Sequence, residues 1–265
     1  MVSIPTEAKA TRPRQRASTS EWRGIVVVAG LLAVWQLAAE WMQSPFLPSL
    51  QQIGRAAVQL SASGDLLQHL EATVGRVIVG FLTGTAAGLI IGLLLGVSIW
   101  VKRLTDSGFT LLRHIPIFGL IPLVTLWFGT QDLAKIVLIA IAAFFPTMLQ
   151  TQEGLRAVPA KYLELAEALT FSRWQTFRRV LLPSALPFIL TGVRHAIAFA
   201  WISGVGGELF MNTGAGLGSL LTAARIETRM DYILLGVAIV AVIGYAMTRG
   251  AVAVEKRIIT WPAPR

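Results

Sequence analysis

The fold is decided by the stretch VIVGFLTGTAAGLIIGLLLGVSIW, residues 77–100, which carries no charged residue. A helix needs about 20 mostly apolar residues to cross roughly 30 Å of membrane hydrocarbon, so this stretch is long enough for one span. Its glycines recur at every fourth position, at Gly80, Gly84, Gly88, Gly92 and Gly96. Residues four apart share a helix face, and glycines there let a second backbone approach closely. The pattern predicts a membrane helix with a packing face, whose partner lies in this chain or in another.

Other apolar runs lie on both sides of this one. We count six candidate spans, over residues 24–42, 77–100, 112–129, 135–152, 187–210 and 232–248. Only 14% of the 265 residues are charged and the mean hydropathy is +0.65, whereas soluble domains carry roughly 25% charged residues. We therefore expect an all-α integral membrane protein with six transmembrane helices. Pro116, Pro122 and Pro146 predict kinks or irregular turns in the third and fourth spans.

The basic residues predict the orientation. The segments at the amino end, after the second span, after the fourth span and at the carboxyl end carry sixteen Lys and Arg, against five in the other connections. The positive-inside rule places the first set, and with it both termini, in the cytosol. We expect a disordered basic cytosolic tail over residues 1–23, a transmembrane domain over 24–258 and a cytosolic end over 259–265. The net charge of +9 lies in these short clusters and not on one face, so no nucleic-acid partner is expected.

The sequence offers little for catalysis or for cofactor and metal binding. It has no cysteine, which excludes disulfides and thiolate chemistry, and no glycine followed by Lys and Ser or Thr, as a Walker A phosphate loop requires. His69, His114 and His195 are far apart and lack a second ligand at metal spacing. The glycine-rich stretch 204–218 follows no strand, so it predicts turns on the outer side and not a dinucleotide site. We expect no enzyme activity, cofactor or metal.

Residues 157–183 are too polar to enter the membrane and too regular for a plain loop. Pro159 suits a first helical turn, and Ser172 and Gln175 have the spacing of a capping box for a second helix. Apolar residues recur along one side, at Leu163, Ala166, Trp174, Phe177 and Leu181. The pattern predicts a helix, a turn and a helix. Periodicity alone leaves two alternatives open: an amphipathic segment on the lipid headgroups, or a docking element for a soluble partner.

The same segment carries a family signature. Glu164-Leu165-Ala166, then Val180, then Leu182-Pro183 stand at the spacing of Glu-Ala-Ala, three residues, Gly, nine residues, Ile-x-Leu-Pro. The match continues through residues 113–129, 144–159, 181–201, 207–210 and 214–221. Over roughly residues 45–257 the sequence resembles the permeases of binding-protein-dependent ABC importers, in particular the sulfonate, taurine and nitrate group. The resemblance implies the MetI-like fold of type I ABC importer permeases.

The resemblance also implies partners and a role. In that family the cytosolic helix-turn-helix couples the permease to an ATPase subunit by fitting a cleft in it. Carried over, the coupling residues are Glu164, Leu165, Ala166, Thr170, Trp174, Phe177, Val180, Leu182 and Pro183. The expected assembly has two ATPase copies, a second permease as a homodimer, and a periplasmic or lipid-anchored binding protein at the bacterial inner membrane. The expected cargo is a small anion such as a sulfonate, taurine or nitrate, and a secondary transporter is the alternative function.

The coupling turn and the transport pathway remain open points. Thr170 stands where the family has glycine, at a turn where a helix end often needs a positive φ that a β-branched residue tolerates poorly. The pathway candidates are Arg194, Glu208, Gly216 and Gly218. Arg194 either extends to the inner headgroups or lies near the transport path. Glu208 either holds the outer loop or lines the exit.

Overall fold

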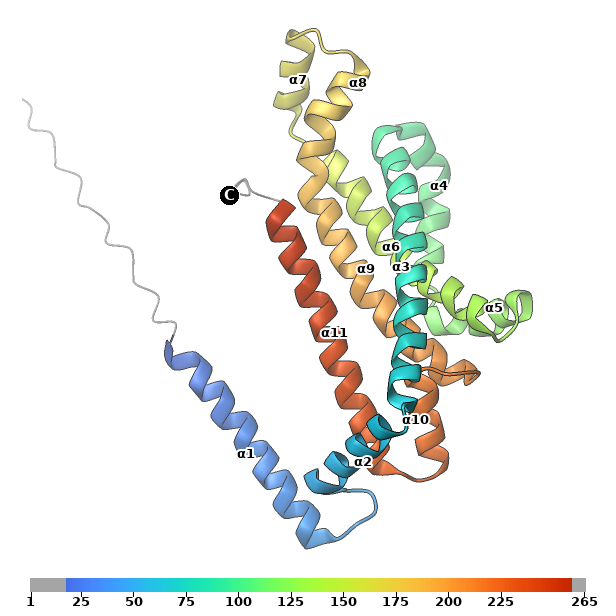
Figure 1. Ribbon diagram of the computed structural model, residues 1–265. Helices are drawn as coiled ribbons and strands as arrows, with labels where there is room; N and C mark the ends of the chain where they lie inside the picture. Colours follow the sequence, from blue (N-terminus) through green and yellow to red (C-terminus); the bar gives the residue numbers. More distant parts are fainter. Residues whose placement is uncertain (1–17, 259–265) are drawn as a thin grey trace, which may run out of the picture. The chain divides into compact units, whose positions relative to one another are not determined.

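The computed structural model describes residues 18–258, so most of the predicted tail, residues 1–17, and the predicted end, residues 259–265, lie outside the described residues. The described chain is helical with short connections and contains no strand. It divides into two compact units, residues 1–52 and 53–265. The helices are α1 (Ser18–Met42), α2 (Leu50–Ala62), α3 (Asp65–Val97), α4 (Ile99–Leu112), the 3₁₀ turn η1 (Ile117–Leu120), α5 (Ile121–Phe128), α6 (Asp132–Arg156), α7 (Ala160–Ala168), α8 (Arg173–Thr176), the π-helical turn η2 (Phe177–Leu181), α9 (Leu182–Met211), α10 (Leu217–Ile226) and α11 (Met230–Ile258) (Figure 1).

In the first unit the chain folds back along the last turns of α1. The Trp35 indole N–H donates to the Pro48 carbonyl oxygen at 3.1 Å, and the Gln36 side chain accepts from the Leu50 N–H at 2.9 Å. Apolar side chains of α1 such as Val27 and Leu31 are exposed. A helix that is apolar on all sides and not buried in protein is typical of a membrane environment.

Among the described residues, four helices of the second unit are long and apolar enough to cross a membrane. They are α3, α6, the continuous run Arg173–Met211 that includes α9, and α11. They contain the predicted fourth, fifth and sixth spans and residues 77–97 of the predicted second span, whose last residues enter α4. Successive long helices run in opposite directions, so that α7 and α8 lie at one end of this unit and α2 and α10 at the other (Figure 1).

The third predicted span, residues 112–129, does not form one crossing helix, whereas the irregular turn predicted at Pro116 is present. Helix α4 ends at Leu112, and α5 has only 8 residues, which span about 12 Å and cannot cross a membrane. The break follows from Pro116, which has no N–H to donate and keeps Ile115 out of the helical conformation. Gly129 then ends α5 with a φ of +75°.

The glycine-rich stretch 204–218 is helical over more of its length than the predicted turns imply. Its first half continues α9 as far as Met211, which agrees with the predicted fifth span over residues 187–210, and α10 begins at Leu217, so only residues 212–216 form a connection. Glycine has a low helix propensity. Tertiary packing overrides that preference here, since Gly206 and Gly207 are buried within α9.

The glycines spaced four apart on α3, which we call the α3 stripe, face α6 of the same chain. They are Gly80, Gly84, Gly88, Gly92 and Gly96. A Cβ added at Gly84 would overlap the Ala140 carbonyl oxygen, and one at Gly88 would lie 2.5 Å from that of Phe144. The same lack of space holds at Gly80, Gly92 and Gly96. The two backbones are therefore in direct contact, which supplies the packing that the hydrophobic effect cannot supply between helices in lipid.

On its other side α6 packs against α9. Gly192 of α9 has no room for a side chain, because a Cβ there would lie 2.8 Å from the Gln150 Cβ. The central core joins α3, α6 and α9 through Val77, Ile139, Ala143, Ala196 and Trp201. The Trp201 indole N–H donates to the Val240 carbonyl oxygen at 3.1 Å and so ties α9 to α11. The long helices thus pack side by side, α3 against α6, α6 against α9 and α9 against α11. This packing fixes the positions of the sites described below.

We predict that Gly84→Ala destabilises the protein and that Gly75→Ala does not. The added methyl at Gly84 must push α3 and α6 apart, at a cost of about 1–3 kcal/mol for overpacking. Gly75 lies on the same helix but has no heavy atom within 4 Å of an added Cβ, and alanine favours a helix over glycine by about 1 kcal/mol. Thermal unfolding of the two purified variants in detergent tests this. Equal midpoints would show that the close contact contributes nothing to stability.

Candidate functional site

The predicted helix-turn-helix over residues 157–183 forms at one end of the second unit. Pro159 precedes α7. Ser172 caps α8, since its hydroxyl accepts from the Gln175 N–H at 3.3 Å while the Gln175 side chain accepts from the Ser172 N–H at 2.8 Å. From α8 the chain passes through the π-helical turn η2 into α9 without interruption. The second arm of the segment is thus the extended end of a long helix.

The segment exposes apolar side chains on α7 and α8. Leu165 and Leu169 are each 56% exposed, and Trp174 is 65% exposed. Leu165 and Leu169 line a shallow hollow of about 190 Å³, whose lining also includes Tyr162, Phe171 and Val180. Apolar surface of this kind, set beside polar residues, is typical of a protein contact.

Other signature residues hold the segment together. Ala166 is only 2% exposed, so it packs inside the segment. The Phe177 ring stacks on Trp174 with ring centroids 5.7 Å apart, and its other contacts are with the cluster around Leu155, Ala185 and Ile189. Val180 and Leu182 are half-buried, whereas Glu164 and Pro183 are exposed. A substitution at Ala166 would therefore disturb the segment itself, and Leu165 is the better probe of its surface.

The turn between the two arms is built on Thr170, whose φ is +55°. The Phe171 N–H donates to the Ala166 carbonyl oxygen and the Thr170 N–H to that of Glu167, each at 2.9 Å. This is a helix-ending Schellman motif, which usually has glycine at the position with positive φ. The turn thus keeps the geometry expected for glycine, and the β-branched Thr170 adopts the left-handed conformation to form it.

At the opposite end of the unit, a buried network surrounds Glu208 of α9. The carboxylate of Glu208, 1% exposed, accepts from Arg76 Nη1 at 2.6 Å, from the Thr73 hydroxyl at 2.8 Å and from the Gly218 N–H at 3.0 Å. Arg76 also donates to Asp132 Oδ1 from Nε at 2.9 Å, and to the Ala215 carbonyl oxygen at 2.7 Å. The network joins α3, α6, α9 and α10.

The connection 212–216 is held by the same network. The Lys135 ammonium group, 1% exposed, donates to the Thr213 carbonyl oxygen, and the Gly216 N–H donates to His69 Nδ1 at 2.8 Å. A Cβ at Gly216 would lie 2.5 Å from the Glu208 carboxylate, and one at Gly218 would overlap the Val205 carbonyl oxygen. Glycine at these positions gives the carboxylate its access to the backbone. Of the two roles considered for Glu208, these contacts are those of a residue that holds the connection 212–216.

The remaining predicted residues lie apart from this network. Arg194 pairs with Glu255 of α11 at 3.3 Å. His114 Nδ1 lies 2.6 Å from the Thr110 carbonyl oxygen, and His195 is exposed. In the described part of the chain no group of three or more His, Asp or Glu is placed to hold a metal ion.

A family model covers two thirds of this chain. Residues 84–260 match the family described as binding-protein-dependent transport system inner membrane component. This chain belongs to that family. The matched residues include the α3 stripe from Gly84 onward, the turn at Thr170 and Glu208 with the members of its network in α6 and α10. His69, Thr73 and Arg76 lie before the matched residues.

Relatives of this permease are similar over nearly their whole length. It is 34% identical to an aliphatic sulfonates transport permease protein, SsuC, of Bacillus subtilis, over 98% of this chain and 95% of that protein. It is 37% identical to SsuC of Escherichia coli, over 88% and 89%, and 31% identical to the taurine transport system permease protein TauC of Escherichia coli, over 90% of each.

Solved structures confirm the predicted MetI-like fold. A chain of the inward-facing MetNI methionine ABC transporter is 19% identical, with a TM-score of 0.63 over 73% of this permease and 95% of that chain. A chain of an amino acid ABC transporter is 18% identical, with a TM-score of 0.64 over 76% and 97%. The permease therefore has the fold of these transporters.

Sequence reasoning missed the partners of Glu208 in the permease. Arg76 and Lys135 were counted only as outer basic residues, and Thr73 and Asp132 were not considered. A signal was present, since Arg76 and Lys135 each stand at the edge of an apolar span. Charged residues in that position are expected to be paired.

We predict that Thr170→Gly stabilises the permease. A residue other than glycine in the left-handed conformation costs about 1–2 kcal/mol, so glycine should raise the unfolding midpoint. Thr228, with a φ of +57°, ends α10 in the same type of motif, and Thr228→Gly should act in the same direction. Ala168→Gly, in the helical part of α7, is the matched control and should cost about 1 kcal/mol. A fall in stability for Thr170→Gly would contradict the assignment of strain to this turn.

Proposed function

We propose that this permease forms the membrane path of an ATP-driven importer for a small anion such as a sulfonate, taurine or nitrate, delivered by an extracytoplasmic binding protein. The observation that carries the proposal is the coupling segment: a capped helix-turn-helix with exposed Leu165, Leu169 and Trp174 at the end of a long membrane helix. The names of its relatives, which include aliphatic sulfonates, taurine and nitrate, support this class of cargo.

The energy source lies on another subunit. The sequence has no Walker A loop, so ATP hydrolysis is assigned to a separate ATPase that receives the coupling segment in a cleft. An amphipathic element that presents apolar anchors to a groove is a recurrent mode of protein docking. Because α8 continues through η2 into α9, a push on the segment is passed on to the membrane helix.

We infer an assembly of two permeases, as a homodimer, with two ATPases and one binding protein at the bacterial inner membrane. The coupling segment and both termini lie in the cytosol, and the end formed by α2 and α10 faces the binding protein. The excess of basic residues at the coupling end supports this orientation.

A secondary transporter is the weaker alternative. Such a protein uses ionisable groups within its spans to carry protons or ions. Glu208 is the buried carboxylate in the described spans, and it already accepts from Arg76, Thr73 and Gly218. Its oxygens are engaged by these three donors and hold α10 to α9, so they are not available to bind a transported ion.

We predict that Leu165→Asp uncouples the permease from its ATPase while Ala160→Asp does not. Burying a leucine side chain in an interface contributes about 1.5–3 kcal/mol, so a charge in its place should weaken ATPase binding at least about tenfold. Ala160 lies in the same helix, is exposed and is outside the hollow. Co-purification with the ATPase and transport-dependent ATP hydrolysis are the measurements. Equal ATPase retention by both variants at equal permease levels would contradict the coupling role.

The absence of cysteine makes the orientation directly testable. Glu227, in the connection before α11, and Glu167, in α7, are both exposed and suit single cysteine substitutions. A membrane-impermeant maleimide is expected to label Glu227→Cys in spheroplasts and Glu167→Cys only after permeabilisation. The reverse pattern would overturn the inferred topology.

A further inference from the structure

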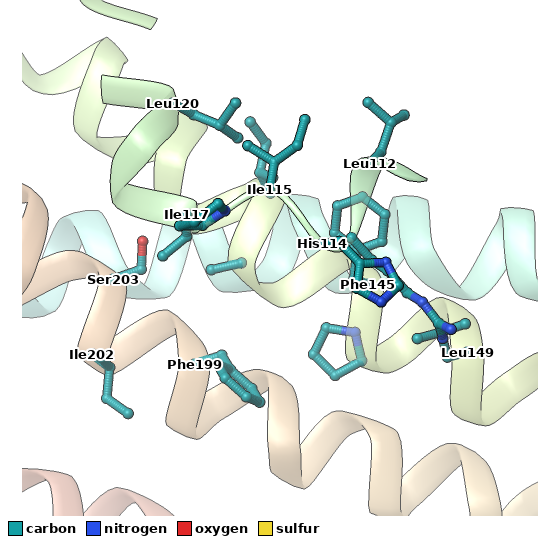
Figure 2. A pocket seen from close by; sticks show the side chains of 15 residues that line it. Leu112, His114, Ile115, Ile117, Leu120, Phe145, Leu149, Phe199, Ile202 and Ser203 are labelled. Atoms are coloured by element: carbon teal, nitrogen blue, oxygen red, sulfur yellow. The ribbon is translucent and has the colours of Figure 1, made fainter. Parts of the chain in front are cut away.

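Helix α11 carries a large exposed surface in the second unit. Only 11% of the residues in its apolar stretch are buried, against 28–39% in the other three crossing helices. Figure 2 shows a cavity of about 490 Å³ that is lined by α6, α9 and residues 112–120 and by no described residue of α11. The exposed surface of α11 is therefore separate from this cavity and meets whatever surrounds the protein in the membrane.

The second half of that surface carries positive charge and no carboxylate. Tyr245, Arg249 and Lys256 are exposed and follow one another at intervals of four and seven residues, so they lie on one face of the helix. Glu255 is the only acidic residue in the second half of α11, and it pairs with Arg194 of α9 at 3.3 Å. Neither Arg249 nor Lys256 forms an ion pair with a described residue. The described part of the chain thus leaves the charge of this face without a counter-charge.

Tyr245 holds the Arg249 side chain toward the membrane. Arg249 Nε donates to the Tyr245 hydroxyl at 2.8 Å, and the guanidinium carbon lies 5.4 Å from the centroid of the Tyr245 ring. Tyr245 is one turn nearer to the amino end of α11, and this direction leads into the bilayer because the carboxyl end is cytosolic in the proposed orientation. Arginine near the end of a membrane helix usually extends toward the headgroups and water. Here Nη1 and Nη2 make no hydrogen bond with a described group, and a cation held at this depth is stabilised by an anionic partner.

An apolar surface continues from these residues toward the middle of α11. Ala238, Ala241 and Val242 are exposed within two turns of Tyr245, and their small side chains let hydrocarbon lie close to the helix. Tyrosine is typical of the membrane interface, where its ring meets hydrocarbon and its hydroxyl meets the headgroups. The face therefore offers a cation where a lipid has its phosphate and an apolar surface where a lipid has its acyl chains.

Lys256 distinguishes between lipids that share a phosphate. It lies about 10 Å farther along the helix toward the cytosol than Arg249, at the level of the outer part of a headgroup. Phosphatidylethanolamine carries an ammonium group beyond its phosphate, and lysine repels a like charge there. Phosphatidylglycerol carries glycerol in that place and keeps a net negative charge, which basic residues beside a membrane helix attract.

We propose that Tyr245, Arg249 and Lys256 form a binding site for the headgroup of one anionic phospholipid of the inner leaflet, of the phosphatidylglycerol class. Arg249 holds the phosphate through Nη1 and Nη2, Tyr245 positions the guanidinium, and Lys256 disfavours lipids with a headgroup ammonium. The acyl chains lie along Ala238 and Val242. The site goes beyond the proposed import function and rests only on its orientation of α11.

The test is native mass spectrometry of the purified full-length permease, titrated with phosphatidylglycerol or with phosphatidylethanolamine of the same acyl chains. The permease should bind phosphatidylglycerol more tightly. Arg249→Gln should weaken phosphatidylglycerol binding at least about tenfold, as expected for loss of charge-assisted hydrogen bonds, and leave phosphatidylethanolamine binding unchanged. Lys256→Gln should reduce the preference by strengthening phosphatidylethanolamine binding.

Two more variants separate a specific site from a general effect of charge. Arg257→Gln removes an exposed cation that is next to Lys256 in the sequence but on another side of the helix, and it should leave both affinities unchanged. Tyr245→Phe keeps the ring and loses the hydroxyl, so it should weaken phosphatidylglycerol binding about threefold to tenfold. Equal affinity of the unmodified permease for both lipids, unaltered binding in Arg249→Gln, or an equal loss in Arg257→Gln would overturn the proposal.

Thermal unfolding in detergent gives a second measurement on the same variants. Without added lipid, Arg249→Gln should unfold at the same midpoint as the unmodified permease, which shows that the variant is folded. Added phosphatidylglycerol should raise the midpoint of the unmodified permease and of Arg257→Gln, because a ligand stabilises the state that binds it. An equal rise in Arg249→Gln would contradict the site.

A second permease copy is the rival occupant of this face. Val242→Cys places a single cysteine beside the site, since the chain has no other, and oxidation of membranes that contain this variant should give no disulfide-linked pair. A linked pair in high yield would show that another copy covers the face, and the lipid proposal would fail. If the permease binds phosphatidylglycerol as expected but does not retain an ATPase, the lipid site stands while the import function fails. ATPase retention without preferential phosphatidylglycerol binding would be the opposite result.

Discussion

The contact of α3 with α6 through glycine is the constraint on which the other features depend. With the two backbones touching at Gly84 and Gly88, the positions of side chains farther along both helices are fixed relative to each other. Arg76, two turns before Gly84, is thereby brought to Asp132 at the start of α6, and the two pair at 2.8 Å. Because lipid offers no hydrophobic drive for helix association, this shape match takes the place of the apolar core of a soluble protein.

The network around Glu208 follows from that contact. A buried carboxylate and a buried guanidinium are each costly to remove from water, and their attraction offsets the cost only when the other donors and acceptors are satisfied. Here they are, through Thr73, Ala215 and the Gly218 N–H. Thr73 has a double role, since its hydroxyl also accepts from the Leu217 N–H at 2.8 Å. The first residues of α10 are thus fixed to α3 by a hydrogen bond between residues far apart in the sequence, and to α9 by the bond from Gly218 to Glu208.

The sequence predicted those features of the fold that depend only on residues close together in the chain. The glycine spacing identified the face of α3, and Ser172 with Gln175 identified the start of α8. The partner of that face and the partners of Glu208 were out of reach, because they depend on which helices meet. In the third span the irregular turn at Pro116 was predicted, because the effect of proline on the preceding backbone is local, but the apolar composition of residues 112–129 still led us to count them as one crossing helix. At Thr170 the sequence suggested strain, and the turn forms with that strain present.

One helix connects the coupling segment to the other end of the second unit. The run Arg173–Met211 begins at the proposed ATPase contact and ends just after Glu208. A shift of this helix would therefore also move the Glu208 network. The π-helical turn η2 and Pro187 interrupt the regular hydrogen bonding between the coupling segment and Glu208, and such interruptions are where helices bend. The motion that reaches the Glu208 network thus depends on how stiff these two points are.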